Sequence, residues 1–218
     1  MLSRREQRTA RRRDLDGSGP ALPGRVIGRH PGVVGGFALL GEVLLTGVLV
    51  TVASLPLVTL PAALVAGSAH LRRYLRAEST SVGGFVADYL AALRRGWAVG
   101  LATLLAVGLL LLDLDLAASG ALPGGQVIAV VGWAGLAVVA LAIGTATGAW
   151  SSRTGWRVAL RRTPRIVRRD PVGALYLLAA FGLVGVCTWA LAPLLVPALG
   201  CLVLAIVAIP ERRASRAA

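Results

Sequence analysis

The sequence predicts an all-α, polytopic membrane protein whose core is a six-transmembrane-helix bundle. Two observations carry this prediction. Hydrophobic residues make up 56% of the 218 residues, and they form uncharged runs longer than a soluble core requires. All 23 basic residues are Arg, and they gather between these runs. Because Arg-rich segments resist translocation, such clusters orient a membrane protein.

The first apolar stretch, Val33–Leu71, predicts a helical hairpin. As one helix it would be about 58 Å long, roughly twice the hydrocarbon thickness of a bilayer. Pro56 and Pro61 supply the break, because proline lacks an amide donor and is well tolerated at a helix start. We therefore expect spans near 33–54 and 56–75. If Val33–Leu71 crossed the membrane only once, Arg72 and the basic residues up to Arg95 would lie outside, which violates the positive-inside rule.

Residues 76–96 predict a short amphipathic helix, since Phe85, Tyr89 and Leu93 recur at helical spacing. Two interpretations of this helix remain open: it lies on the membrane surface, or it packs on its own bundle. Trp97 then opens the third predicted span. The third to sixth spans are predicted near 97–112, 127–150, 172–190 and 191–209.

The segment 151–171 holds the densest charge, and we expect Pro164 to break any helix in it. Its arginines form a candidate lipid or partner surface: Arg153, Arg157, Arg161, Arg162, Arg165, Arg168 and Arg169. Juxtamembrane Arg attracts anionic lipid by about 1 kcal/mol each. The alternative is that these residues only fix the topology.

The predicted organisation has three parts: a disordered Arg-rich cytoplasmic tail at 1–31, a transmembrane domain at 32–210 and a cytoplasmic tail at 211–218. Both termini are then cytoplasmic, and the outer connections carry only Asp113 and Asp115. The expected location is the bacterial cytoplasmic (inner) membrane. The net charge of +13 does not predict nucleic-acid binding, because the Arg clusters flank apolar spans and form no known nucleic-acid module.

The segment from Ser54 to Pro61, read Ser-Leu-Pro-Leu-Val-Thr-Leu-Pro, follows the pattern Ser-Leu-Pro-apolar-apolar-Thr. A basic segment from Arg72 to Arg76 follows it, then the amphipathic stretch from Asp88 to Arg95 and a span that ends at Asp113. In these features, over roughly residues 40–115, the chain resembles the YesL-like family of small bacterial membrane proteins, which carry a domain of unknown function. The motif residues of this hairpin are Ser54, Pro56, Thr59 and Pro61.

The resemblance implies an accessory role in sugar uptake, since family members tend to occur beside carbohydrate ABC importers. The implied partners are ABC-type importer subunits, in addition to a bilayer that contains anionic lipid. This chain departs from the family at Gly47, which stands with aliphatic neighbours where members often have Asn and an aromatic cluster. No role of that Asn carries over.

Glu42 is the acid deepest in a predicted span, and such residues usually face the bundle interior or a water path. Thr46 shares its helix face, and His70 borders the same hairpin, so the three form a candidate intramembrane polar site. One interpretation makes Glu42 a proton or cation site. The other makes it a protonated carboxyl bonded across helices, or a residue nearer the membrane edge.

Several other residues are predicted to serve helix packing or membrane anchoring rather than a binding or catalytic site. Cys187 and Cys201 lie in apolar segments without metal-ligand or disulfide spacing. Gly144 and Gly148 form a small-xxx-small pair that lets helices approach. The aromatic residues Trp97, Trp150 and Trp156 are predicted anchors at the cytoplasmic interface.

The sequence therefore predicts no catalytic residue, no metal site and no cofactor, and a protein that is not an enzyme. Two functions compete. The first is a non-catalytic accessory or regulatory partner of a carbohydrate transport system. The alternative is an autonomous transporter or channel for a small solute or ion, with Glu42 on its path and prolines that break its helices. The oligomeric state is left open.

Overall fold

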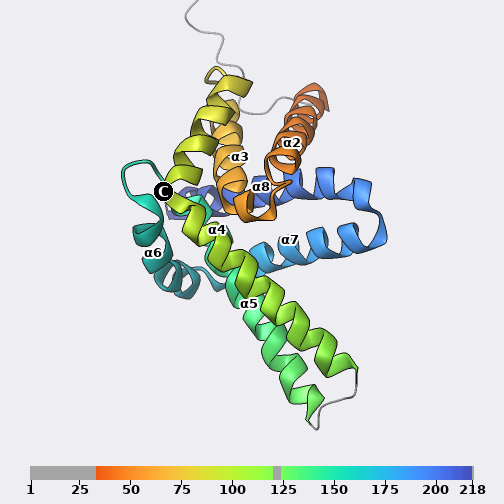
Figure 1. Cartoon of the computed structure of the whole chain (residues 1–218). Helices are drawn as coiled ribbons and strands as arrows, with labels where there is room; N and C mark the ends of the chain where they lie inside the picture. The colour runs from red at the N-terminus through yellow and green to blue at the C-terminus, as the bar shows by residue number, and fades with distance from the viewer. Residues whose placement is uncertain (1–32, 120–123, 218) are drawn as a thin grey trace, which may run out of the picture. The chain divides into compact units, whose positions relative to one another are not determined.

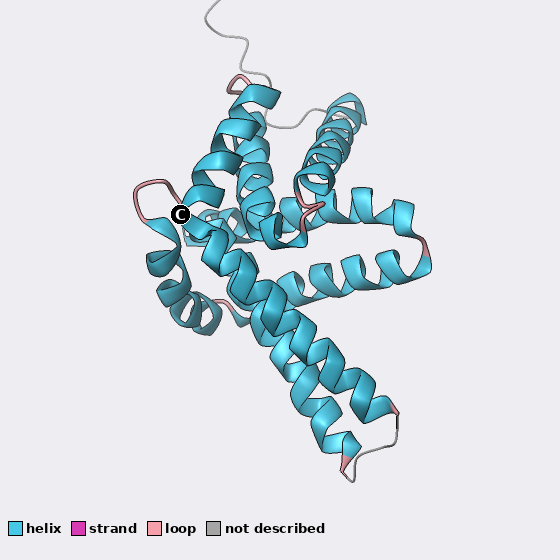
Figure 2. Cartoon of the chain, in the orientation of Figure 1, coloured by secondary structure: helices cyan, strands magenta, loops and turns pink. Residues whose placement is uncertain are grey.

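The computed structural model describes residues 33–119 and 124–217, and the side chains of 36–119 and 124–210. Helices form all regular structure in these ranges, without a strand (Figure 2), so the predicted all-α class is confirmed there. The chain divides into units 1–39 and 40–218, and every contact below lies within the second. The predicted tail at 1–31 falls outside the described residues.

The helices of Figure 1 follow one another with short connections. They are, in chain order, α2 (Val33–Ala53), the short 3-10 helix η1 (Leu57–Thr59), α3 (Leu60–Leu75), α4 (Val82–Ala118), α5 (Gly125–Ala149), α6 (Gly155–Arg169), α7 (Pro171–Ala190), the short η2 (Ala192–Leu194) and α8 (Leu195–Ala217).

The chain turns back sharply between α2 and α3. Thr59 closes the turn, because its hydroxyl lies 2.6 Å from the Ala53 carbonyl oxygen and 2.8 Å from that of Pro56. Pro61 stands in the first turn of α3, where its missing N–H breaks no helical hydrogen bond. Ser54 and Thr59 are both buried. The motif residues therefore build a compact turn, and α2 and α3 pack side by side in opposite directions.

Within residues 33–119 and 124–217, five helices are long and apolar enough to cross a membrane, whereas the sequence predicted six spans. These candidate spans are Gly36–Ala53, Val82–Ala118, Gly125–Ala149, Pro171–Ala190 and Ala192–Pro210. The predicted span at 56–75 is not among them. Its helix, α3, has 16 residues, and at about 1.5 Å per residue it is shorter than a hydrocarbon core of roughly 30 Å. Every residue from Pro61 to Ser68 is nevertheless buried.

Helix α4 corrects the prediction of a separate amphipathic helix at 76–96 followed by a span at 97–112. It is a single helix of 37 residues, capped by the Ser81 hydroxyl, which accepts from the Gly84 N–H at 3.1 Å. Proline is absent from Val82–Ala118, so nothing interrupts the backbone hydrogen bonds. Phe85 is buried, so its face packs on the bundle, as one of the two interpretations of this segment expects.

Helix α6 corrects the prediction that Pro164 breaks the charged segment, because Pro164 lies inside the helix. Proline removes one amide donor, but packing of the inward face holds the remaining turns. Trp156 and Ala159 are buried on that face. Thr163, two turns beyond Trp156, lies 3.0 Å from the hydroxyl of Thr145 on α5. The charged segment is therefore an amphipathic helix rather than a loop.

Helices α7 and α8 form a hairpin through η2. Asp170 caps α7 by accepting from the Gly173 N–H at 2.8 Å, and Pro171 follows at the first helical position. Helix α8 continues through Pro210 to Ala217, beyond the predicted end of its span at 209. The predicted tail at 211–218 is therefore helical as far as Ala217.

Glycines set the close crossing of α2 and α8. A Cβ at Gly47 would overlap the Val196 carbonyl oxygen, and one at Gly200 would overlap that of Val43. Gly47 is the position at which the chain departs from the YesL-like pattern. Here a side chain of any size would push the two backbones apart, which explains the glycine.

Candidate functional site

Glu42 on α2 and His70 on α3 form a carboxyl–imidazole pair, in which His70 is buried and Glu42 is partly buried. The His70 Nε2 lies 2.7 Å from the Glu42 Oε1. The side chains are 2% exposed for His70 and 15% exposed for Glu42. The antiparallel packing of α2 and α3 brings together residues 28 positions apart. The structure thus joins two of the three residues of the candidate polar site in one hydrogen bond.

Thr46 is fully buried one turn from Glu42, but its hydroxyl serves the backbone. It donates to the Glu42 carbonyl oxygen at 2.8 Å, a common arrangement for Thr within helices. Its methyl group lies beside Gly67 of α3, where a Cβ would come within 3.3 Å of it. Thr46 therefore supports the α2–α3 packing beside the pair.

The second ring nitrogen of His70, Nδ1, is buried and has no hydrogen-bond partner among the described residues. The ring of Phe85 on α4 meets His70 edge-on, with centroids 6.3 Å apart and an angle of 83° between the planes. A proton on Nδ1 would therefore bury an unpaired donor, which costs about 1–3 kcal/mol. A change in the charge of the pair requires either water or a movement of these helices.

A second pair lies one helical turn away. The Arg73 Nη2 donates to the Asp88 Oδ2 at 2.5 Å, and the side chains are 31% and 26% exposed. Arg73 follows His70 by three residues on α3, and Asp88 follows Phe85 by three on α4. The sequence analysis did not predict this pair. The shared i, i+3 spacing on both helices was the signal that could have found it.

Arg72 reaches the end of another helix. Its Nη2 donates to the Gly148 carbonyl oxygen at 2.7 Å, close to the C-terminus of α5. The last carbonyls of a helix lack partners within the helix and favour a cation. The structure therefore holds Arg72 against the end of α5.

All seven arginines of the candidate surface are exposed, six of them on α6 and Arg153 in the turn before it. The opposite face of α6 packs on α4 and α5. There the Trp156 indole Nε1 donates to the Ala92 carbonyl oxygen at 3.1 Å, and Trp156 is 3% exposed. The prediction that Trp156 anchors the protein at the membrane interface is therefore wrong, because its ring fills the core beside Gly96.

The remaining predicted residues lie apart from the pair. A Cβ at Gly144 would come within 2.7 Å of Leu177 on α7, whereas one at Gly148 would meet Ile206 on α8 at an ordinary 3.5 Å. Only Gly144 of this small-xxx-small pair is thus required for a close approach. Cys187 and Cys201 are free thiols, half-buried and exposed.

Over the described residues, no group of three or more His, Cys, Asp or Glu side chains is placed to hold a metal ion. Comparisons with protein-family models, with curated proteins and with solved structures find no match for the chain. The resemblance to the YesL-like family therefore stays a prediction.

The fold and the site define the class of the protein. In the part of the chain that the structure describes, it is all-helical, with five helices long and apolar enough to cross a membrane. It holds a buried carboxylate–imidazole pair between α2 and α3.

Proposed function

We propose that the chain is a non-catalytic, multi-pass protein of the bacterial cytoplasmic membrane that transports a proton or a proton-coupled small solute. The observation that carries this proposal is the 2.7 Å contact between Glu42 and His70 inside a mostly apolar protein. Ionisable groups within membrane-spanning structure are costly to insert and mark ion and proton pathways. Carboxylate and imidazole are also the groups that most often carry protons in such relays.

The pair links protonation to movement. When Glu42 is ionised and neutral His70 carries its proton on Nε2, that nitrogen donates to Oε1. A second proton on Nδ1 would bury a donor that has no partner among the described residues, and one on Glu42 would convert the carboxylate to a weaker acceptor. Either change is unfavourable in the packing of α2 and α3 described above, which is how protonation can drive a movement of these helices. The non-helical turn between these helices, Ser54–Pro56, supplies a place where they can rearrange.

The orientation follows from charge. Placing both termini and the Arg clusters in the cytoplasm leaves Asp113 and Asp115 near the outer end of the α4–α5 hairpin, in agreement with the positive-inside rule. This arrangement needs an even number of crossings, so the short helix α3 must return the chain across the membrane within the bundle. Its burial supports this role, because neighbouring helices rather than lipid surround it.

Proton flux in proteoliposomes tests the proposal. Purified protein is reconstituted with an internal pH-sensitive dye, and a potassium gradient with valinomycin sets the membrane potential. We expect the wild-type protein to acidify the lumen when the interior is negative, and Glu42→Gln to abolish this flux. Gln preserves the shape of Glu and accepts one hydrogen bond from Nε2, but its side-chain amide takes up no proton at the pH of the assay.

The matched control is Asp88→Asn, which neutralises the more exposed carboxylate one turn away. It should retain most of the flux. Size-exclusion profiles and thermal melting in detergent establish that each variant is folded. The absence of wild-type flux, or flux that survives in folded Glu42→Gln, would overturn the transport proposal.

A second candidate, an accessory partner of a carbohydrate transport system, is favoured by one feature, the exposed arginine face of α6. Clustered Arg can form forked hydrogen bonds to the carboxylates of a partner. Crosslinking in native membranes followed by mass spectrometry tests this function. Importer subunits recovered through 151–171 would support it. A chain recovered without them would remove it.

A further inference from the structure

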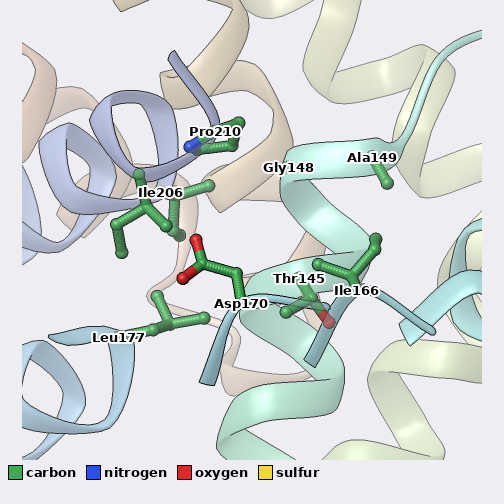
Figure 3. A pocket seen from close by; sticks show the side chains of 10 residues that line it. Thr145, Gly148, Ala149, Ile166, Asp170, Leu177, Ile206 and Pro210 are labelled. Carbon is green, nitrogen blue, oxygen red and sulfur yellow. The ribbon is translucent and has the colours of Figure 1, made fainter. Parts of the chain in front are cut away.

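A cavity of about 290 Å³ lies away from the Glu42–His70 pair, where α5, α7 and α8 meet the C-terminal end of α6 (Figure 3). Its lining is mostly hydrocarbon, contributed by Leu177 of α7, Ile206 and Ile209 of α8, and Ile166 of α6. The cavity is open at one side, so it can admit a chain from outside the protein. An apolar space of this kind suits hydrocarbon rather than a polar solute.

The two polar side chains of the lining are already engaged. Thr145 donates to the Leu141 carbonyl oxygen at 2.6 Å. The Asp170 Oδ1 accepts from the Gly173 N–H at 2.8 Å as the cap of α7. In Figure 3 the Asp170 carboxylate lies among the lining side chains, near those of Ile206 and Leu177. The cavity interior therefore offers apolar contact and little free hydrogen bonding.

Two exposed arginines of α6 are helical neighbours of a residue that lines the cavity. Arg162 precedes the lining residue Ile166 by four positions and Arg169 follows it by three, so both are its neighbours on the helix surface. Arg157 and Arg161 stand nine and five positions before Ile166, on the opposite side of the helix. The helical spacing thus puts Arg162 and Arg169 on the side of α6 that carries Ile166, from which their guanidinium groups can reach the edge of the cavity.

We propose that this cavity and its rim bind one anionic phospholipid. The acyl chain occupies the space between α5, α7 and α8, and the phosphate pairs with Arg162 and Arg169. Guanidinium groups match a phosphate with two parallel hydrogen bonds, and they are weakly hydrated, so this pairing is favourable at a membrane surface. The complementarity of charge and of apolar lining favours an anionic lipid over a zwitterionic lipid or a protein segment.

Native mass spectrometry of the purified protein in detergent tests the proposal, with phosphatidylglycerol, phosphatidylcholine or glycerol phosphate added. We expect one phosphatidylglycerol to bind in preference to phosphatidylcholine, and glycerol phosphate to bind poorly because it lacks the acyl chain. Arg162→Gln with Arg169→Gln should weaken phosphatidylglycerol binding about tenfold or more. Arg157→Gln with Arg161→Gln removes the same charge and should change it by less than about threefold.

A second pair of variants tests the cavity itself. Gly148 lines the cavity, so Gly148→Leu should fill it and displace the lipid. Gly182→Leu on α7 is the matched control, because nothing lies within 4 Å of a Cβ there. Equal losses in both arginine pairs would contradict a defined headgroup site and indicate a diffuse charge effect. Equal binding of phosphatidylcholine, or binding that survives a filled cavity, would also overturn the proposal.

Discussion

Helix α3 buries eight consecutive residues, Pro61–Ser68, whereas the second half of α4 leaves Leu105, Leu109 and Leu112 each more than 60% exposed. The buried helix also carries Ser68, His70 and two arginines, while the exposed one is almost wholly aliphatic. In a water-soluble protein the exposed leucines would be unfavourable. In a bilayer the lipid tails cover them, and the interior is free to hold small and polar residues.

This contrast shows that the specific interactions of the protein lie around the buried helix α3. The small residues of α3 let α2, α4 and α8 approach closely; for example, a Cβ at Gly67 would come within 2.6 Å of Val50. Close approach also brings the Glu42 and His70 side chains within hydrogen-bond distance. The exposed half of α4 packs mainly on α5 and presents the rest of its surface outward. Substitutions in the two regions should therefore differ in size, and four predictions use this difference.

The largest effect is expected from breaking the buried pair. His70→Leu leaves the Glu42 carboxylate without its partner and should lower the free energy of unfolding by about 3–5 kcal/mol. The double variant Glu42→Met with His70→Leu removes both polar groups and should recover most of that loss. Unfolding in mixed micelles with increasing sodium dodecyl sulfate measures both. Additive losses in the double variant would show that the pair is not coupled.

Truncating an aliphatic side chain in each region compares their packing directly. Leu64 on α3 is 0% exposed and Leu105 on α4 is 65% exposed. Leu64→Ala should cost about 2–5 kcal/mol, because it opens a cavity in the core. Leu105→Ala should cost less than about 0.5 kcal/mol in the same unfolding assay. Equal costs would mean that the two sites share one environment.

Two glycines of α4 allow a buried and an exposed position of the same helix to be compared. A Cβ at Gly100 would overlap the Val58 carbonyl oxygen, while nothing lies within 4 Å of one at Gly108. Gly100→Ala should therefore destabilise the protein by about 1–3 kcal/mol through overpacking. Gly108→Ala should stabilise it by up to about 1 kcal/mol, because Ala favours the helix. Thermal melting in detergent checks the opposite signs, and a stable Gly100→Ala protein would contradict the packing.

The smallest effect is expected at Arg73–Asp88, whose side chains are about a third exposed. A double-mutant cycle with Arg73→Gln and Asp88→Asn should give a coupling energy below about 1 kcal/mol, because solvent screens the pair. The coupling should shrink further when salt is raised. A coupling as large as that of Glu42 and His70 would show that this pair is part of the core.

The sequence alone was enough to predict an all-helical chain of apolar segments, because these segments are long and the prolines and glycines between them are clear. It was also enough to single out Glu42, since a lone acid in an aliphatic run has few explanations. The hydrogen bond between Glu42 and His70 could not be predicted from the hairpin alone. The distance between the two side chains depends on how closely Gly67 lets α2 and α3 pack.

The failures share one cause, which is that tertiary packing overrides local signals. Pro164 stays inside α6 since Trp156 and Ala159 hold that helix to the bundle. The predicted border between an amphipathic helix and a span near Trp97 is absent, because α4 has no helix breaker there. A hydropathy pattern finds the helices that face lipid. It passes over a short, buried helix such as α3, which the break at Pro56 and Pro61 located in the sequence instead.

Site-directed spin labelling in lipid nanodiscs tests the central contrast most directly. Cys187 and Cys201 are first replaced by Ser, and a single Cys is then placed at Ala63 on α3 or at Leu105 on α4. Collision rates with oxygen, which is concentrated in the bilayer, and with a water-soluble nickel complex report the surroundings of each label. We predict low rates with both reagents at position 63 and a high oxygen rate at position 105. An oxygen rate at position 63 as high as that at 105 would contradict a buried α3.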